Sequence, residues 1–236
     1  QIRFGARRAR AAPEAPVRSS RAGRGLVAWG NMEAMPSAPP PSDPAGSTAA
    51  PRPPLWTRPF ILVSATYLFV AMIFYTLMTA MALYAVTSFG ASDAEAGVVV
   101  GAFVLGAVLT RMTTTPATFA WGRRRVLLVA LACYVLTTAA YLWADSLAAL
   151  TAVRLLNGMC FGAAGTVLAT AVQRIVPPVR RSEGTGWFST SMTLAGAVGP
   201  MVALQLSTTL GYDALFWACI GFTGMALLIA LFLRVP

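Results

Sequence analysis

Two arginines lie inside long apolar stretches of this sequence, where a charged side chain is unusual. Arg111 falls in the stretch 96–119 and Arg154 falls in the stretch 147–172. An arginine inside a membrane-spanning segment costs free energy, so it normally faces a water-filled cavity or a polar partner. Arg111 lies toward one end of its stretch, and its side chain can instead reach the membrane surface. We therefore expect Arg154, and in second place Arg111, to line a polar cavity.

The residue types that catalysis and metal binding need are scarce. The sequence has no histidine, which removes the commonest general base and a frequent metal ligand. Intramembrane proteases need a Ser-His pair, histidine ligands for zinc or paired aspartates inside spans, and the sequence offers none of these. The cysteines stand alone in separate apolar stretches, without a zinc-type spacing, at Cys133, Cys160 and Cys219. We expect no enzymatic activity, no metal site and no cofactor.

Six apolar stretches organise the chain. Hydrophobic residues make up 57% of it and charged residues 11%, against about 25% charged in soluble globular proteins. A helix needs roughly 20 apolar residues to cross the hydrocarbon core of a bilayer. We predict an all-α integral membrane protein, a bundle of six transmembrane helices with spans at about 59–86, 96–119, 126–144, 147–172, 185–210 and 214–233.

Glycine and proline predict details of these spans. A polar loop is expected at 173–184, and Gly199-Pro200 is expected to break the fifth span. Small residues one turn apart let a neighbouring helix approach closely. They occur in the second and fourth spans, at Gly97, Gly101, Gly158, Gly162 and Gly165.

The loops between the spans differ in charge. Acids and no arginine lie on one side of the predicted membrane, at Asp93, Glu95, Asp145 and Asp213. The other side holds Arg123, Arg124, Arg125, Arg174, Arg180, Arg181 and Arg234. Because cytoplasmic loops carry the excess of arginine, this side is predicted to be cytoplasmic, and both chain termini lie on it. We expect a multi-pass protein of the cell membrane, either a plasma or an inner membrane.

Residues 1–58 differ in composition from the rest of the chain. They are rich in Arg, Pro, Ala and Ser and lack apolar periodicity, so a disordered cytoplasmic tail is expected. An arginine-rich arm for nucleic acid or anionic lipid and an organelle transit peptide are alternatives. Translation from Met32 or Met35 would leave the first part as leader rather than native coding sequence. Because the arginines are scattered among prolines, we expect no nucleic-acid partner.

Three motifs resemble those of the major facilitator superfamily, in the N-terminal six-helix half of its twelve-helix fold. They are Gly122-Arg123-Arg124-Arg125 after the second span, Arg154-Leu155-Leu156-Asn157-Gly158 in the fourth, and Gly186, Gly199 and Pro200 in the fifth. The motifs occur in the family's order and on the matching sides of the predicted membrane. The resemblance covers residues 55–236.

This resemblance implies a secondary transporter that moves a small molecule by alternating access, as two six-helix halves rock around a central cavity. Helices one and four line that cavity in the family, and the loop motif forms a cytoplasmic gate. The implied cavity residues are Tyr67, Tyr75, Arg154 and Asn157, with Arg111 added for its charge, and the implied gate residues are Gly122, Arg123 and Arg124. The tyrosines can equally be packing residues or anchors at the lipid interface.

The resemblance also implies partners and a direction. The partners are the lipid bilayer, a small-molecule substrate, and either a C-terminal six-helix half or a second copy of this chain. The partial helix-five motif favours efflux by proton antiport, although every acid after Asp43 lies in a loop or at the end of a span. Thr115 and Phe119 stand where the family's loop motif has glycine and aspartate. This departure keeps open the alternative of a non-transporting structural or receptor-like membrane protein.

Overall fold

The structure, a computed structural model, describes residues 53–233, which form six long helices joined by short connections. The helices are α1 (Arg58–Phe89), α2 (Asp93–Trp121), α3 (Arg123–Ala139), α4 (Leu147–Ile175), α5 (Arg181–Thr209) and α6 (Tyr212–Phe232), and two short 3-10 helices are η1 (Ala140–Trp143) and η2 (Pro178–Arg180). All six long helices are apolar and long enough to cross a membrane, and no strand occurs in the described range. The predicted all-α bundle of six membrane-spanning helices is therefore confirmed.

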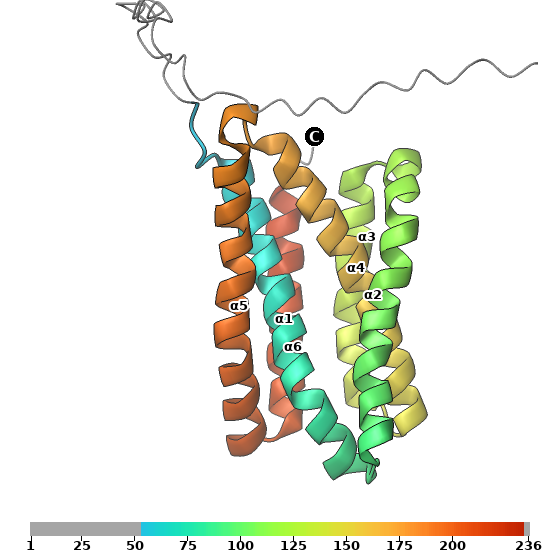
Figure 1. Ribbon diagram of the computed structural model, residues 1–236. Coiled ribbons are helices and arrows are strands. Elements are labelled where there is room, and N and C mark those ends of the chain that lie inside the picture. Colours follow the sequence, from blue (N-terminus) through green and yellow to red (C-terminus); the bar gives the residue numbers. More distant parts are fainter. Residues whose placement is uncertain (1–52, 234–236) are drawn as a thin grey trace, which may run out of the picture. The chain divides into compact units, whose positions relative to one another are not determined.

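The helices pack as two groups of three. α1 packs mainly on α5 and α6, whereas α4 packs mainly on α2 and α3 (Figure 1). The two groups meet where α3 contacts α6 and where α1 contacts α2 and α4. Each group thus combines one helix from one half of the sequence with two helices from the other half. This exchange holds the first three helices of the sequence and the last three together.

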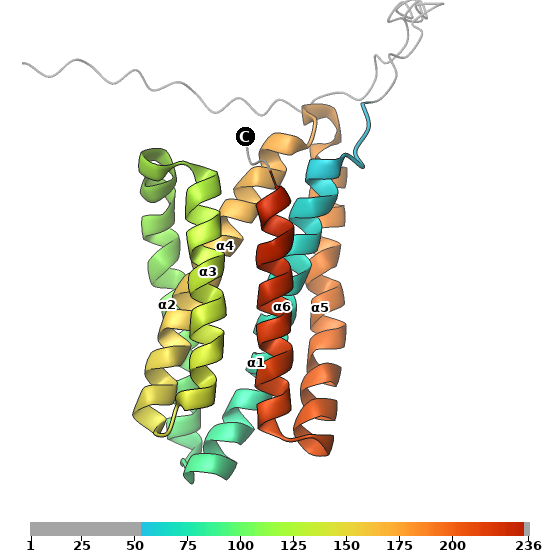
Figure 2. The same ribbon diagram turned by 180° about the vertical axis from the view of Figure 1, so that it is seen from behind.

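The bundle has two different sides. Figure 1 looks onto the side where α1, α2, α4 and α5 lie in front. Figure 2 shows the opposite side, where α3 and α6 lie in front. The residues predicted to line a cavity lie on α1, α2 and α4, so the first side is the relevant one for the candidate site.

Short polar signals set several helix ends. Ser92 and Glu95 form a capping box at the start of α2, and the Ser146 hydroxyl accepts a hydrogen bond from Ala149 N (3.2 Å) at the start of α4. Gly122 alone separates α2 from α3, with φ of 83°, a conformation that side chains other than glycine strain to adopt. This one-residue turn places the three arginines that follow it on the first turn of α3.

The helices differ from the expected ones in three places. α4 continues to Ile175 and α5 begins at Arg181, so only 176–180 remains outside these helices from the predicted loop 173–184. The third span ends in the 3-10 helix η1 rather than as a continuous α-helix. Gly199-Pro200 does not break α5, which runs unbroken through it. Proline removes one backbone donor there, and the long contact of α5 with α1 supports the helix on both sides.

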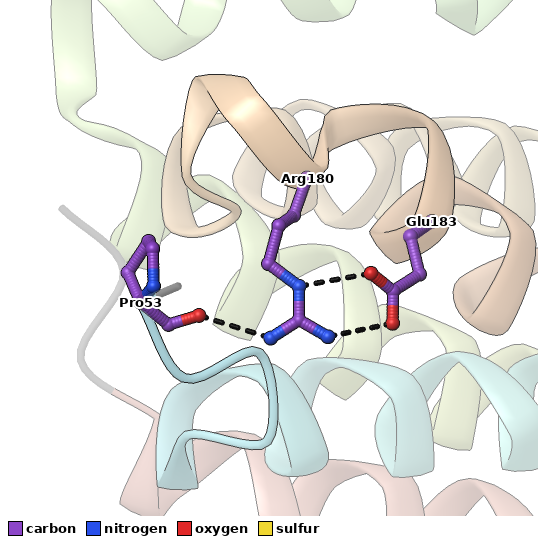
Figure 3. A network of polar contacts seen from close by, with 3 residues as sticks. All are labelled: Pro53, Arg180 and Glu183. Carbon is purple, nitrogen blue, oxygen red and sulfur yellow. Dashed lines mark hydrogen bonds and ion pairs between the residues drawn. The ribbon is translucent and has the colours of Figure 1, made fainter. Parts of the chain in front are cut away.

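Residues 53–57 precede α1 and pack on the turn between α4 and α5, although the sequence placed them in a tail. Arg180 donates to both carboxylate oxygens of Glu183 (2.8 and 2.6 Å) and to the Pro53 carbonyl (2.9 Å), as Figure 3 shows. Leu55 is buried below this contact, and a Cβ on Gly184 would come within 3.1 Å of its Cδ1. The remainder of the predicted tail, residues 1–52, lies outside the described residues.

Candidate functional site

Arg154 lies inside the bundle and is the eighth residue of α4. Its side chain is 1% exposed. Its Nη2 donates to the Leu77 carbonyl of α1 (3.1 Å), and its guanidinium carbon lies 5.2 Å from the centre of the Phe103 ring of α2. The guanidinium is also within electrostatic range of Tyr134 and Tyr141. A backbone carbonyl and aromatic rings therefore surround this charge.

No carboxylate neutralises Arg154 among residues 53–233. The ion pair found in this range joins Arg180 and Glu183. The acids of this range lie in the first turns of helices or in a connection, at Asp93, Glu95, Asp145, Glu183 and Asp213. Nε of Arg154 makes no hydrogen bond within the described part of the chain. A buried charge costs several kcal/mol, whereas the hydrogen bond to Leu77 returns about 1.5–3 kcal/mol and the Phe103 ring about 2 kcal/mol. These contacts at best offset the cost, so Arg154 adds little to stability.

Asn157 ties α4 to α3. Its side chain is fully buried, and Nδ2 donates to Thr137 Oγ1 (3.2 Å) and Thr138 Oγ1 (3.1 Å). The Thr138 hydroxyl donates in turn to the Tyr134 carbonyl (2.7 Å). Asn157 thus holds two helices together from within, three residues after Arg154. The role of the two threonines was not predicted from the sequence, because a threonine pair in an apolar span does not indicate which residue it will bind.

α2 and α4 cross in direct backbone contact beside Arg154. A Cβ on Gly162 would lie 2.5 Å from the Ala107 carbonyl oxygen, and one on Gly158 would collide with the Phe103 backbone. Gly106 on α2 makes the matching approach to the Leu155 carbonyl. This close crossing brings the Phe103 ring next to Arg154. The glycines of the sequence predicted the close approach of a helix to the fourth span. The sequence did not predict that Phe103 would pack on Arg154.

Gly97 and Gly101 do not have the close neighbour expected of them. A Cβ at either position would meet no atom within 4 Å in this structure. Both glycines are exposed on α2, and Gly101 lines an open groove between α2 and α4. Spacing alone identifies glycines that share a helix face, but it does not tell which face meets another helix.

Tyr67 and Tyr75 lie where α1 contacts α5. The Tyr67 ring stacks on Phe188, with centroids 4.4 Å apart, and its hydroxyl donates to Met192 Sδ (3.5 Å). Tyr75 packs on the helix-five motif, since a Cβ on Gly199 would lie 2.7 Å from the Cβ of Tyr75. Both tyrosines are half-buried. Each tyrosine therefore packs against α5 with one part of its side chain and leaves the other part exposed.

The three residues of the helix-five motif have different surroundings. Gly199 is buried, and its carbonyl accepts a hydrogen bond from Thr76 Oγ1 (3.3 Å). Pro200 follows within the helix and is half-buried. Gly186 is exposed near the start of α5, and a Cβ there would meet no atom within 4 Å. Gly199 thus explains the close approach of α5 to α1, and nothing in the structure explains Gly186.

Arg111 is exposed on α2, within electrostatic range of Tyr67 on α1. The five cavity candidates therefore divide into two sets. Tyr67, Tyr75 and Arg111 keep an open edge on the bundle, whereas Arg154 and Asn157 lie inside it. A second protein domain that approached from outside would meet the first set and not the second.

The arginines after Gly122 contact different elements. Arg124 donates to the Leu231 carbonyl near the end of α6 (3.1 Å), which links the α2–α3 turn to that helix. Arg123 is half-buried and lines a cavity of about 80 Å³ between the ends of α2 and α4, together with Arg174. The motif thus binds the end of α6 and borders a cavity between the ends of α2 and α4. No cluster of three or more His, Cys, Asp or Glu that could bind a metal occurs within 53–233.

Comparisons with known proteins identify related sequences. Residues 63–236 match the family model described as Major Facilitator Superfamily. An uncharacterized MFS-type transporter of Methanocaldococcus jannaschii is 24% identical over 155 residues, covering 66% of this chain and 40% of that protein. A chloramphenicol efflux pump of Mycobacterium tuberculosis is 30% identical over 132 residues, covering 55% of this chain and 31% of the pump. The chain thus spans about a third to two fifths of the length of these relatives.

Solved structures share the fold. The human organic anion transporter MFSD10 (TETRAN) superposes with a TM-score of 0.62 at 21% identity, over 78% of this chain and 48% of that one. A peptide transporter POT, solved with alafosfalin, superposes with a TM-score of 0.67 at 14% identity, over 75% of this chain and 40% of that one. In both cases the six helices match about half of a transporter or somewhat less.

Proposed function

Because this chain belongs to the major facilitator superfamily, a family of membrane transporters, we propose that it forms one six-helix half of a secondary transporter that works by alternating access. The other half is a second bundle of six helices, supplied either by the continuing polypeptide or by a second copy of this chain. The two bundles enclose the substrate site and rock about it, so that the site opens to each side of the membrane in turn.

The observation that carries this proposal is the side formed by α1, α2, α4 and α5 (Figure 1). There Tyr67 stacks on Phe188 and contacts the Met192 thioether, and the exposed Arg111 of α2 is within electrostatic range of Tyr67. Aromatic rings and a thioether accept varied apolar groups, and a guanidinium binds an anion or a polar group. We assign one wall of the substrate cavity, called the substrate wall below, to five residues: Tyr67, Tyr75, Arg111, Phe188 and Met192.

The substrate class follows from that wall. Its apolar rings and single cation suit an amphipathic or anionic small molecule. The similarity to the mycobacterial chloramphenicol efflux pump supports efflux as the direction of transport. Efflux by proton antiport needs a titratable group, and no carboxylate lies in the middle of a helix within 53–233. The second half therefore supplies the coupling carboxylate.

Two further roles complete the proposal. Gly122, Arg123 and Arg124 form the cytoplasmic gate, since Arg124 binds the end of α6 and Arg123 lines a cavity between the ends of α2 and α4. Arg154 and Asn157 line the substrate path only when α1 and α4 move apart, because both are buried in the state described.

The experiment is an accumulation assay with the full natural polypeptide in an efflux-deficient bacterium. We expect lower cellular accumulation of chloramphenicol or of a fluorescent amphipathic anion than in cells with an empty vector. Arg111→Gln should reduce transport about tenfold, the loss expected from about 1.4 kcal/mol of substrate interaction. Arg181→Gln removes another exposed arginine, at the first residue of α5, and should leave transport unchanged.

A protein that reaches the membrane at normal levels and changes the accumulation of no compound in a broad panel would contradict this proposal. That outcome would favour the structural or receptor-like alternative. Equal losses for Arg111→Gln and Arg181→Gln would instead remove Arg111 from the substrate wall.

A further inference from the structure

An apolar groove of about 280 Å³ lies between α2 and α3, with α4 as its floor. α2 and α3 contact each other little, because each packs on α4, and this leaves the space between them open. Ala117 of α2, Ala130 and Cys133 of α3, and Met159 and Cys160 of α4 are among the lining residues. The small side chains at its walls make the groove suited to a flexible hydrocarbon chain.

The groove continues into a cationic surface. Trp121 lines the groove, an adjoining depression with Arg125, Leu128 and Val129, and a further depression that Arg123, Arg124 and Arg125 share. Trp121 therefore stands between the apolar and the charged part. Tryptophan prefers this position at a membrane–water interface, where its ring is amphipathic.

No acidic residue lies near this surface along its own helices. The sequence has no acid between Glu95 and Asp145, a range that includes all of α3. Arg125 is exposed and makes no hydrogen bond or ion pair with any residue in the described range, while Arg124 binds the Leu231 carbonyl. The guanidiniums also lie at the positive end of the α3 dipole, which adds to the unfavourable energy of their mutual repulsion. An anion at this surface would relieve it.

The dimensions of the groove match a lipid. Cys133 follows Arg125 by eight residues, which corresponds to a depth of about 12 Å at helical rise. One leaflet of hydrocarbon is about 15 Å thick, so a chain that starts at the arginines remains in the groove through most of its leaflet. A free phosphate would occupy the cationic surface and leave the apolar groove empty.

We propose that this groove binds one anionic glycerophospholipid, with its phosphate at Arg125, its glycerol region beside the Trp121 indole, and one acyl chain between α2 and α3. The site takes phosphatidylglycerol in preference to phosphatidylcholine, because the zwitterionic head group presents a second cation to the arginines. The bound lipid fills the gap between α2 and α3 and holds the turn that carries Arg123 and Arg124.

The test is fluorescence quenching by brominated lipid in nanodiscs that contain the full chain. The sequence has six tryptophans, so the signal of Trp121 is obtained as the difference between the wild type and Trp121→Phe. The discs contain phosphatidylcholine and an increasing fraction of brominated phosphatidylglycerol, and a parallel series contains brominated phosphatidylcholine. We expect the anionic lipid to quench Trp121 at a lower fraction than the zwitterionic lipid.

Matched variants separate the site from general attraction. Arg125→Gln should raise the half-quenching fraction about fivefold, the effect of one arginine near an anionic head group. Arg181→Gln removes one charge elsewhere and should change nothing. Val129→Phe narrows the groove and should weaken quenching by the anionic lipid, whereas Val104→Phe, at a similarly exposed position of α2 that lines none of these depressions, should not. Thermal unfolding of each variant checks that it is folded.

Three results would overturn the proposal. Equal quenching of Trp121 by the two lipids means that only the general lipid layer contacts it. Equal effects of Arg125→Gln and Arg181→Gln mean that diffuse charge attracts the lipid. Absence of quenching by either lipid means that a protein segment, either a second bundle or a second copy, covers the groove.

Discussion

Arg154 carries a permanent charge at a place where the bundle excludes water. One carbonyl of α1 and the ring of Phe103 interact with it, and no acid in the described range does. A folded protein gains little stability from such a group, because desolvation costs more than these contacts return. Its presence is therefore better explained by a function that needs the charge than by the fold.

Arg154→Met separates these roles. Methionine nearly matches the length of the arginine stem and removes the charge, and replacing buried charges by apolar residues is often neutral or stabilising by about 1–4 kcal/mol. We therefore expect a melting temperature equal to or above that of the wild type, together with loss of transport in the accumulation assay. Scanning fluorimetry in detergent gives the melting temperature. A variant that melts well below the wild type would show that Arg154 is needed for folding instead.

At the scale of helices, the crossing of α2 and α4 depends on glycines that face each other across it. Gly158 and Gly162 meet the α2 backbone, while Gly106 meets α4. The contact leaves no room for a methyl group at these positions, so the two helices approach as closely as their backbones allow. This crossing sets the distance between Phe103 and Arg154 and so determines the surroundings of the charge.

Gly162→Ala tests the crossing against a control on the same pair of helices. The added methyl would lie 2.5 Å from the Ala107 carbonyl oxygen, and overpacking of this kind costs about 1–3 kcal/mol. Gly101→Ala meets no atom within 4 Å and should stabilise its helix by about 0.5–1 kcal/mol. Thermal unfolding of both variants in the same detergent measures the difference. If the two variants melted alike, the close crossing would not be present in the protein.

The segment before α1 offers a second test at this scale. Leu55 is 2% exposed, and truncation of a buried leucine costs about 2–5 kcal/mol. Leu55→Ala should therefore loosen the segment and speed chymotryptic cleavage after the exposed Trp56. Arg180→Gln breaks the exposed ion pair in Figure 3 and should change stability little, because such pairs contribute little in water. If Arg180→Gln accelerated cleavage more than Leu55→Ala, the ion pair rather than the burial of Leu55 would hold this segment in place.

At the scale of the whole bundle, the arginine-rich and acidic connections predict which end faces the cytoplasm. Hydrocarbon excludes guanidinium groups, so the arginines at the α2–α3 and α4–α5 connections are expected on one side and Asp93 on the other. The bundle fixes the relation between the two ends, since six spanning helices alternate in direction. Only the sidedness in the membrane needs a separate measurement.

Single cysteines measure it directly. Asp93→Cys and Val179→Cys are placed in a chain whose Cys133, Cys160 and Cys219 are replaced by serine. Both positions are exposed, and they belong to opposite ends in the predicted topology. An impermeant maleimide added to intact cells should label position 93 and should label position 179 only after permeabilisation. Labelling of both positions from the same side would contradict the six-span topology.

The sequence by itself determined the helices of this protein and their number. Long runs without charge have one stable form in a bilayer, because every backbone polar group must be hydrogen-bonded within its own segment. The predicted spans therefore lie within the observed helices to a few residues, and the order of the motifs indicated the family. The misplaced boundaries, such as the loop at 173–184, lie where charged residues continue a helix beyond the apolar run.

Only the tertiary structure decided what the polar residues face. Arg154 and Asn157 looked like cavity residues because a span hides the direction of its side chains, and the packing of α4 on α1, α2 and α3 turns both inward. Phe188 and Met192 join Tyr67 from 121 or more residues away, through the contact of α1 with α5. Apolar patterning records how much of a helix avoids water. It does not record which helix it meets, because lipid and a neighbouring helix are equally apolar.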